Sequence, residues 1–245
     1  ADFSRMDFWL PVIGVFPALL GGGVALALGI VFPGETMITA VAVLGAQYFC
    51  FNLFHLDGLM DSADAFLGTV NREKRLEILK DSRIGVYAFF AGLFVFLLKL
   101  GLLESLLRSP CPALLFAWPL SGRTAAALIP VICPPRSDSG LGALAKDSRG
   151  LRVAAGAFTA LLCWLGLSCG LRALAAALAA PYFAGVFSPA AALPFLAPLA
   201  AFPVARAYRR GLGGYTGDAL GAAVELGELA HLALAFLLSR SVFSA

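Results

Sequence analysis

Three aspartates in one short stretch form the clearest chemical pattern in the sequence. Asp57, Asp61 and Asp64 are spaced i, i+4 and i+7, so on a helix they lie within roughly 60° of one another on one face. The residues between them are mostly apolar and include no Lys or Arg. Two bare carboxylates about 5–6 Å apart repel by roughly 3 kcal/mol at an effective dielectric near 20. The pattern therefore predicts a bound cation, and oxygen-only ligands favour Mg²⁺.

Basic residues and further titratable groups flank these aspartates. His55 precedes them. After them comes a charged segment, 72–77, that is typical of a solvated helix, and Lys80, Asp81 and Arg83 follow shortly after that segment. Acidic metal ligands next to basic side chains are what an enzyme needs to hold a diphosphate and to neutralise charge during phosphoryl transfer. His55 is interpreted as a metal neighbour, a proton acceptor or an interfacial side chain.

A second acidic set lies near the C-terminus. Gly214 belongs to a glycine-rich turn whose backbone amides could approach phosphate oxygens closely. Asp218 follows, then Glu225 and Glu228 within a predicted span. Ionisable residues inside a membrane span are costly and usually face a polar site. These residues are therefore candidates for binding substrate.

Arg123 stands within a predicted span, in the run SGRT. A lone intramembrane arginine should face a carboxylate, a phosphate or a wet cavity. Of these, we favour an anionic substrate.

The composition is that of a polytopic membrane protein. Of the 245 residues, 60% are hydrophobic and only 13% are charged, about half the charged fraction of an ordinary soluble domain, roughly 25%. This excludes disorder and a basic nucleic-acid-binding domain, so no nucleic-acid partner is expected. The five cysteines include no CxxC pair, which argues against a zinc site or a disulfide framework.

The apolar runs predict an all-α bundle in the lipid bilayer with about seven spans and a single domain, 1–245. Three polar segments, 55–84, 134–152 and 206–219, hold most of the basic residues and are therefore assigned to the cytoplasm. Because 134–152 and 206–219 are both assigned to the cytoplasm, an even number of spans must lie between them. Residues 153–205 leave room for two spans, with a re-entrant or surface-lying piece around 173–187. The predicted spans are 10–32, 36–54, 85–103, 111–133, 153–171, one within 173–205, and 220–238.

The motifs HLDGLMDSAD, KDSRIG and GGYTGDALGA, with a Glu-bearing helix after the last, resemble the cobalamin synthase family. Its members are adenosylcobinamide-GDP ribazoletransferases, integral membrane enzymes of coenzyme B12 assembly. The resemblance implies a Mg²⁺-dependent reaction in the bacterial plasma (inner) membrane, with the active site facing the cytoplasm. A ribose hydroxyl of α-ribazole, or of α-ribazole 5′-phosphate, would attack the cobinamide-linked phosphorus of adenosylcobinamide-GDP, and GMP would leave.

The resemblance also implies roles for individual residues. The three clustered aspartates would carry the metal, and Asp81 would complete that shell or accept the nucleophile's proton. Asp218 with Glu225 would contact the second substrate or another metal. The family commonly has glycine after the third aspartate, where this sequence has Ala65. The extra methyl group weakens any claim that the backbone must approach the substrate closely at that point. The diphosphate would be held by Lys80, Arg83 and Arg123.

Two other classes of protein remain as alternatives. A CDP-alcohol phosphotransferase also binds metal with membrane aspartates, but the AR step expected after its DG is missing from the sequence after Asp64. An ion-coupled transporter would place its carboxylates at the bilayer midplane, often within inverted repeats, and no repeat is visible. The sequence leaves the oligomeric state open, a homo-oligomer included.

Overall fold

The computed structural model describes residues 5–68, 71–81, 83–108, 116–137, 145–178 and 189–242, and these residues form helices without any strand. The predicted all-α class is confirmed. The elements are α1 (Met6–Ile13), α2 (Val15–Val31), α3 (Thr36–Gln47), η1 (Tyr48–Asn52), α4 (Leu53–Leu67), α5 (Arg72–Ile78), α6 (Val86–Leu107), α7 (Trp118–Ile132), α8 (Gly150–Ala177), η5 (Pro189–Ala200), α9 (Ala201–Leu212) and α10 (Gly217–Val242).

Five helical runs are long and apolar enough to cross a membrane. One of them continues through α3, η1 and α4, so the aspartates lie on the extension of a span rather than in a polar loop. The helix α7 is shorter than the predicted span 111–133, whose first five residues lie outside the described part of the chain. The five runs are Met6–Val31, Thr36–Leu67, Val86–Leu107, Gly150–Ala177 and Gly217–Ser239.

The region between residues 150 and 212 differs from its prediction in three ways. The helix α8 continues to Ala177, past the predicted end at residue 171. The segment Pro189–Ala200 is a 3₁₀-helix, because its prolines lack the N–H groups that an α-helix requires. Arg206 and the residues after it were predicted in a polar loop, but they extend the helix α9 to Leu212. Of the predicted re-entrant piece, residues 179–187 lie outside the described residues.

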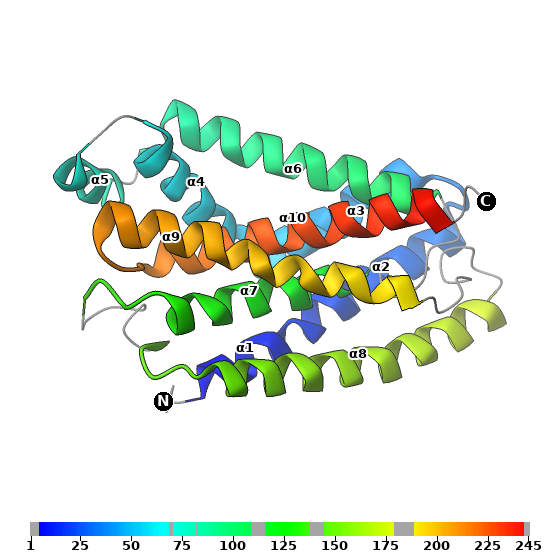
Figure 1. Ribbon diagram of the computed structural model, residues 1–245. Helices are drawn as coiled ribbons and strands as arrows, with labels where there is room; N and C mark the ends of the chain where they lie inside the picture. Colours follow the sequence, from blue (N-terminus) through cyan, green and yellow to red (C-terminus); the bar gives the residue numbers. More distant parts are fainter. Residues whose placement is uncertain are drawn as a thin grey trace.

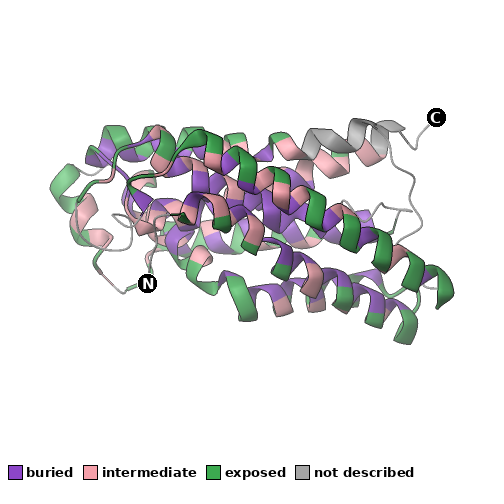
Figure 2. Ribbon diagram, turned by 90° about the horizontal axis from the view of Figure 1, so that it is seen from below, coloured by how far each residue is buried: buried purple, intermediate pink, exposed green. Residues whose placement is uncertain are grey.

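The long helices lie side by side, and α10 occupies a central place among them (Figure 1). It contacts α4, α6, α7, α9 and η5. Buried residues follow the inner faces of the bundle and exposed residues its outside (Figure 2). Many of the exposed side chains are large and apolar, including Phe89, Phe90 and Leu97 of α6. An apolar outer surface is what a helix bundle presents to lipid.

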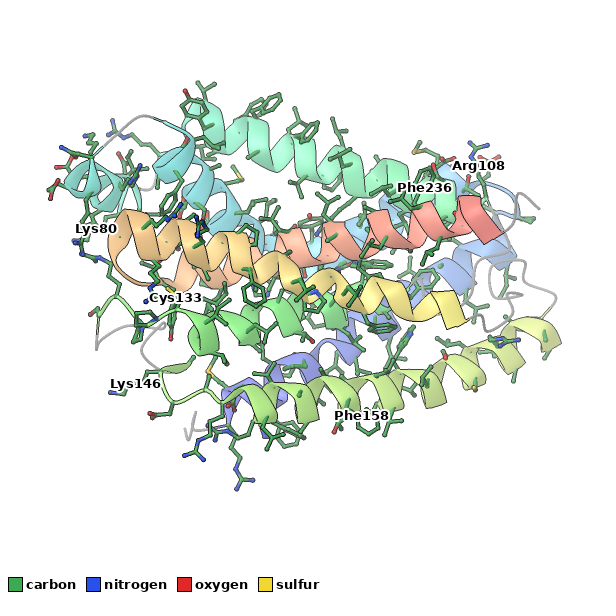
Figure 3. The ribbon with its side chains drawn as sticks, in the orientation of Figure 1. Lys80, Arg108, Cys133, Lys146, Phe158 and Phe236 are labelled. Carbon is green, nitrogen blue, oxygen red and sulfur yellow. The ribbon has the colours of Figure 1, made fainter. Side chains whose placement is uncertain are left out.

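The two ends of the bundle differ in charge. The C-terminal ends of α4, α7 and α9 meet at one end, where Lys80 and Lys146 also lie, while Arg108 lies at the other end (Figures 1 and 3). Most exposed basic residues belong to the first of these ends: Arg72, Lys74, Lys80, Arg83, Arg136, Lys146, Arg149, Arg206, Arg209 and Arg210. This is the end that the sequence predicts to be cytoplasmic.

Glycines allow α7 and α10 to pack closely. A methyl group added at Gly122 would lie 2.5 Å from Cγ of Glu228 and 2.7 Å from the carbonyl oxygen of Val224. One added at Gly227 would lie 3.1 Å from Cα of Gly122. Small residues at membrane helix interfaces let two backbones approach in this way.

We predict that Gly122→Ala destabilises the protein, because the added methyl group forces α7 and α10 apart. Overpacking of this kind costs about 1–3 kcal/mol, and thermal unfolding in detergent measures it. Gly166→Ala on α8 is the matched control, since a methyl group there meets nothing within 4 Å. Equal melting temperatures for the two variants would show that the α7–α10 contact is not tight.

Candidate active site

The aspartates lie where the second span leaves the apolar part of the bundle. The π-helical turn η1 precedes α4, and Asp57 is exposed while Asp61 and Asp64 are half-buried. A single π turn inside a longer helix is often associated with a functional site.

A contact between two glycines joins the two acidic motifs. A methyl group on Gly58 would lie 3.2 Å from Cα of Gly221, and one on Gly221 would lie 2.9 Å from the carbonyl oxygen of His55. This close crossing of α4 and α10 brings Asp218, in the first turn of α10, to the acidic part of α4. A methyl group on Gly58 would lie 3.0 Å from the carbonyl oxygen of Asp218.

Asp61 is the centre of the resulting acidic cluster. It interacts electrostatically with Asp57, Asp64 and Asp218. The side chains of Asp57 and Asp61 make no hydrogen bond with the described residues, whereas Asp218 accepts one from the hydroxyl of Thr216 at 3.0 Å. The cluster consists of oxygen ligands only, and no basic side chain bonds to its two most open members.

Asp64 has a different set of contacts from the other two predicted metal ligands. Its Oδ2 accepts a hydrogen bond from the backbone N–H of Gly85 at 2.7 Å, and its Oδ1 accepts one from Ala88 at 2.8 Å. It therefore caps the N-terminus of α6, where free N–H groups and the helix dipole favour a carboxylate. A methyl group on Gly85 would lie 2.4 Å from Oδ2 of Asp64, which explains the glycine that closes KDSRIG.

Because Asp64 turns toward α6, the three predicted ligands do not form a ready metal site. Among the described residues, no group of three His, Cys, Asp or Glu side chains is arranged to hold a metal ion. The Mg²⁺ assignment therefore stays a prediction.

The segment just before α6, whose end Asp64 binds through the N–H of Gly85, carries the predicted diphosphate ligands at the surface. Lys80 and Arg83 are exposed, and Arg83 Nε donates to both oxygens of Asp81, at 2.9 and 3.0 Å. Hydrogen bonds from the side chain and backbone of Arg83 lower the pKa of Asp81 to about 2. Asp81 is thus a weak proton acceptor while this pair is intact.

His55 lies on another face of α4 from the aspartates. It precedes Asp57 by two residues, which is about 200° of helical rotation. The His55 ring lies 6.3 Å from the Phe54 ring and makes no hydrogen bond with the described residues. Its electrostatic partners include Arg123 and Glu225 rather than the aspartates.

Arg123, Glu225 and Glu228 belong to a buried network inside the bundle. Arg123 donates to Glu228 and, at 2.7 Å, to Oδ1 of Asn52. Lys99 on α6 donates to Glu225 at 2.7 Å and to Glu228 at 2.8 Å. Of the three environments considered for Arg123, the structure shows a carboxylate.

Polar residues of α3 and η1 complete this network. Tyr48 donates to Glu225 at 2.7 Å, Asn52 donates to both glutamates at 3.0 and 2.9 Å, and Gln47 donates to Glu228 at 3.2 Å. The network contains two cations and two carboxylates, and all its members are buried. Its charges balance without a ligand.

The glycine-rich turn before α10 packs against another loop. Gly213 ends α9 with φ of +81°, a left-handed conformation that favours glycine. A methyl group on Gly214 would lie 2.7 Å from the backbone nitrogen of Arg136, so a larger residue would push apart two loops that hydrogen bonds join, Tyr215 N–H to Pro134 and Arg136 N–H to Tyr215. Gly214 therefore positions the start of α10.

Two arginines of α5, which forms the predicted solvated helix and has no buried residue, also bond to helix ends. Arg72 donates to the carbonyl oxygen of Leu212 at 2.7 Å, at the end of α9, and Arg75 donates to that of Ala65 at 3.1 Å, near the end of α4. Cations at helix C-termini satisfy free carbonyl groups.

Comparison with known proteins identifies the family. A model of cobalamin-5-phosphate synthase matches residues 1–236. The chain belongs to the cobalamin-5-phosphate synthase family.

Curated relatives cover nearly the whole chain. A protein of Citrobacter koseri is 35% identical over 94% of this chain and 87% of its own. One of Azorhizobium caulinodans is 32% identical over 94% and 83%, and one of Desulfitobacterium hafniense is 33% identical over 96% and 87%. Each is named adenosylcobinamide-GDP ribazoletransferase. No solved structure matches the chain.

In this cobalamin-5-phosphate synthase family member, the charged residue of the buried network that sequence reasoning missed is Lys99. A single lysine inside the apolar run 86–107 was the available signal. It is fully buried and bonded to two glutamates on another helix.

We predict that Lys99→Met destabilises the protein by about 3–5 kcal/mol, because it leaves two buried carboxylates with one cation fewer. Thermal or denaturant unfolding in detergent measures the loss. The matched control is Lys74→Met, which removes the exposed pair with Glu77 and should cost about 0–1 kcal/mol. The account of the network would be wrong if both variants were equally stable.

Proposed function

We propose that this chain is an adenosylcobinamide-GDP ribazoletransferase that joins α-ribazole, or α-ribazole 5′-phosphate, to adenosylcobinamide-GDP and releases GMP. The family and the relatives' names support the reaction. The observation in this structure that carries the proposal is the Gly58–Gly221 contact, which gathers the aspartates of two separate motifs at one end of the bundle.

We assign Mg²⁺ binding to the acidic cluster of Asp57, Asp61 and Asp218, one or two of whose carboxylates would ligate the ion while phosphate oxygens and water complete its shell. These carboxylates are electrostatic neighbours, and the first two have no hydrogen-bond partner among the described residues. An oxygen-only set suits Mg²⁺, which usually takes one or two carboxylates together with phosphate oxygens and water. Bound Mg²⁺ would neutralise charge on the diphosphate. Asp64 is assigned to hold the segment that carries Lys80 and Arg83 beside this site.

The reaction forms one phosphorus–oxygen bond and breaks another. The hydroxyl oxygen of the ribazole attacks the cobinamide-linked phosphorus, the bond to the GMP oxygen breaks, and the hydroxyl proton passes to water at this exposed end of α4. Lys80 and Arg83 are exposed cations that can hold the phosphates in place. Asp81 and His55 are left without an assigned proton-transfer role, because Arg83 holds the first and the second lies on another face of α4.

We further propose seven crossings of the bacterial inner membrane, with the acidic cluster at the cytoplasmic end. The helix α7 and the run η5–α9 lie beside the five long helices and add two crossings to theirs (Figure 1). Exposed basic residues gather at the end that holds the cluster, as the positive-inside rule expects of a cytoplasmic face.

Purified protein in nanodiscs, supplied with Mg²⁺, adenosylcobinamide-GDP and α-ribazole, should release GMP and form a cobalamin product in equal amounts. Chromatography with mass detection measures both. Folded protein that releases no GMP with any divalent metal would contradict the proposal.

We predict that Asp61→Asn lowers GMP release by at least about 10²–10³-fold, the loss typical of removing one electrostatic group from a site of charge stabilisation. Single-turnover assays measure it. Asp147→Asn, which changes an exposed loop carboxylate, is the control and should keep full activity. Full activity of Asp61→Asn with unchanged folding would remove α4 from the metal site.

Cysteine labelling tests the orientation. In a variant without the five native cysteines, Lys74→Cys should react with an impermeant maleimide only from the cytoplasmic side. Glu35→Cys, in the exposed turn between α2 and α3, should react only from the opposite side. The reverse pattern would place the acidic cluster outside the cytoplasm.

A further inference from the structure

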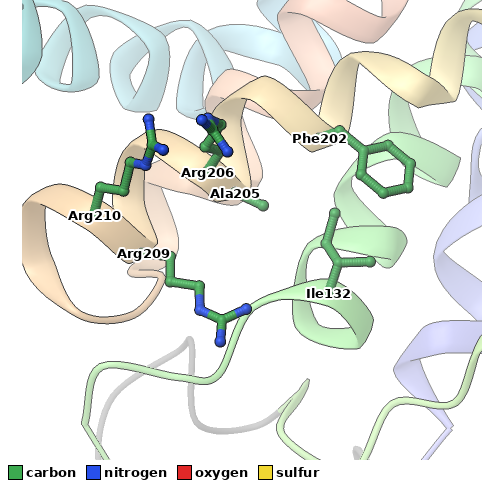
Figure 4. Close-up of a pocket in the computed structure, with 6 residues that line it drawn as sticks. All are labelled: Ile132, Phe202, Ala205, Arg206, Arg209 and Arg210. Carbon is green, nitrogen blue, oxygen red and sulfur yellow. The ribbon is translucent and has the colours of Figure 1, made fainter.

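A basic cleft lies between α9 and the C-terminal end of α7, apart from the acidic cluster. Its volume is about 390 Å³. The side chains that line it are Ile132 of α7 and Phe202, Ala205, Arg206, Arg209 and Arg210 of α9 (Figure 4).

The three arginines give the cleft an unbalanced positive charge. Their spacing of i, i+3 and i+4 places them on one face of α9. Within the described part of the chain, none of the three side chains forms an ion pair, and no acidic residue lines the cleft. Three like charges at this distance repel one another, so an anion bound among them would be stabilised.

The opposite face of α9 packs against α4. The hydroxyl of Tyr208 lies 2.7 Å from that of Ser62, and a methyl group on Gly211 would lie 2.6 Å from the ring of Phe66. These two α9 residues are about 140–200° of helical rotation from Arg206. The arginine face therefore points away from α4, which carries the acidic cluster.

The cleft is apolar on the side toward the membrane interior. Phe202 lies one helical turn before Arg206 and is half exposed, and Ile132 faces it from α7 (Figure 4). Cationic groups at the end of the bundle and apolar groups one turn deeper match the order of parts in a phospholipid, a phosphate followed by a glycerol ester and acyl chains. Basic pockets between membrane helices are a known type of site for anionic headgroups.

We propose that this cleft binds the phosphate of an anionic phospholipid through Arg206, Arg209 and Arg210, with the start of the acyl chains against Phe202 and Ile132. The proposal does not depend on the ribazole transfer reaction.

The test is a titration of delipidated full-length protein in neutral detergent with phosphatidylglycerol or phosphatidylcholine, followed by native mass spectrometry. Wild-type protein should prefer phosphatidylglycerol by about tenfold or more, given roughly 1 kcal/mol for each basic residue near anionic lipid. The variant Arg206→Gln/Arg209→Gln/Arg210→Gln should lose this preference.

The matched control is Arg5→Gln/Lys74→Gln/Arg149→Gln. It removes the same charge from exposed residues of other elements at the same end of the bundle and should keep the preference. Equal losses in the two triple variants would show that net charge, rather than the cleft, attracts the lipid, and would overturn the proposal. If the cleft variant unfolds, the single variant Arg209→Gln makes the same comparison with Lys74→Gln.

A second titration separates a lipid from a soluble phosphate. Inorganic diphosphate should displace phosphatidylglycerol poorly, because it makes no contact with Phe202 and Ile132. Diphosphate that displaces the lipid efficiently, and whose binding is lost in the cleft variant, would show a site for a soluble phosphate and overturn the lipid assignment.

Discussion

The balance of charge inside the bundle is the constraint on which the rest of the structure depends. Lys99 and Arg123 come from α6 and α7, and both reach the glutamates of α10. A buried charge is tolerated only when it is paired and hydrogen-bonded. Polar residues of α3 and η1 supply the remaining donors. The helices around α10 must therefore keep their axial positions and their rotations relative to it. Otherwise a charge would be left without a partner in an apolar interior.

This constraint also determines where the aspartates of α4 and α10 lie. With α10 fixed by its glutamates, Asp218 at its first turn has a defined position, and the Gly58–Gly221 contact sets the aspartates of α4 against it. Asp64 then holds the start of α6 beside them. Glu225 and Glu228 hold α10 in place through buried contacts inside the bundle, whereas Asp218 lies at the end of the bundle.

The sequence predicted the helical membrane class and the family, because apolar run length and short motifs carry those signals. It could not predict the partner of Arg123, since a lone arginine is compatible with a carboxylate or a phosphate until α7 is placed against α10. The role of Asp64 was hidden for the same reason, because its partners are backbone N–H groups 21 and 24 residues away. The 3₁₀ segment depends on local backbone geometry around its prolines, which apolar patterning does not report.

We have proposed that α4 and α10 together form one site for metal and diphosphate. A cryo-electron microscopy structure of the chain with Mg²⁺ and adenosylcobinamide-GDP, without the second substrate, tests it most directly. We expect metal density about 2.0–2.1 Å from carboxylate oxygens of α4 and of Asp218, with the diphosphate bound to the metal. Diphosphate density elsewhere, for example at Arg206, Arg209 and Arg210, with no metal at the aspartates, would contradict it.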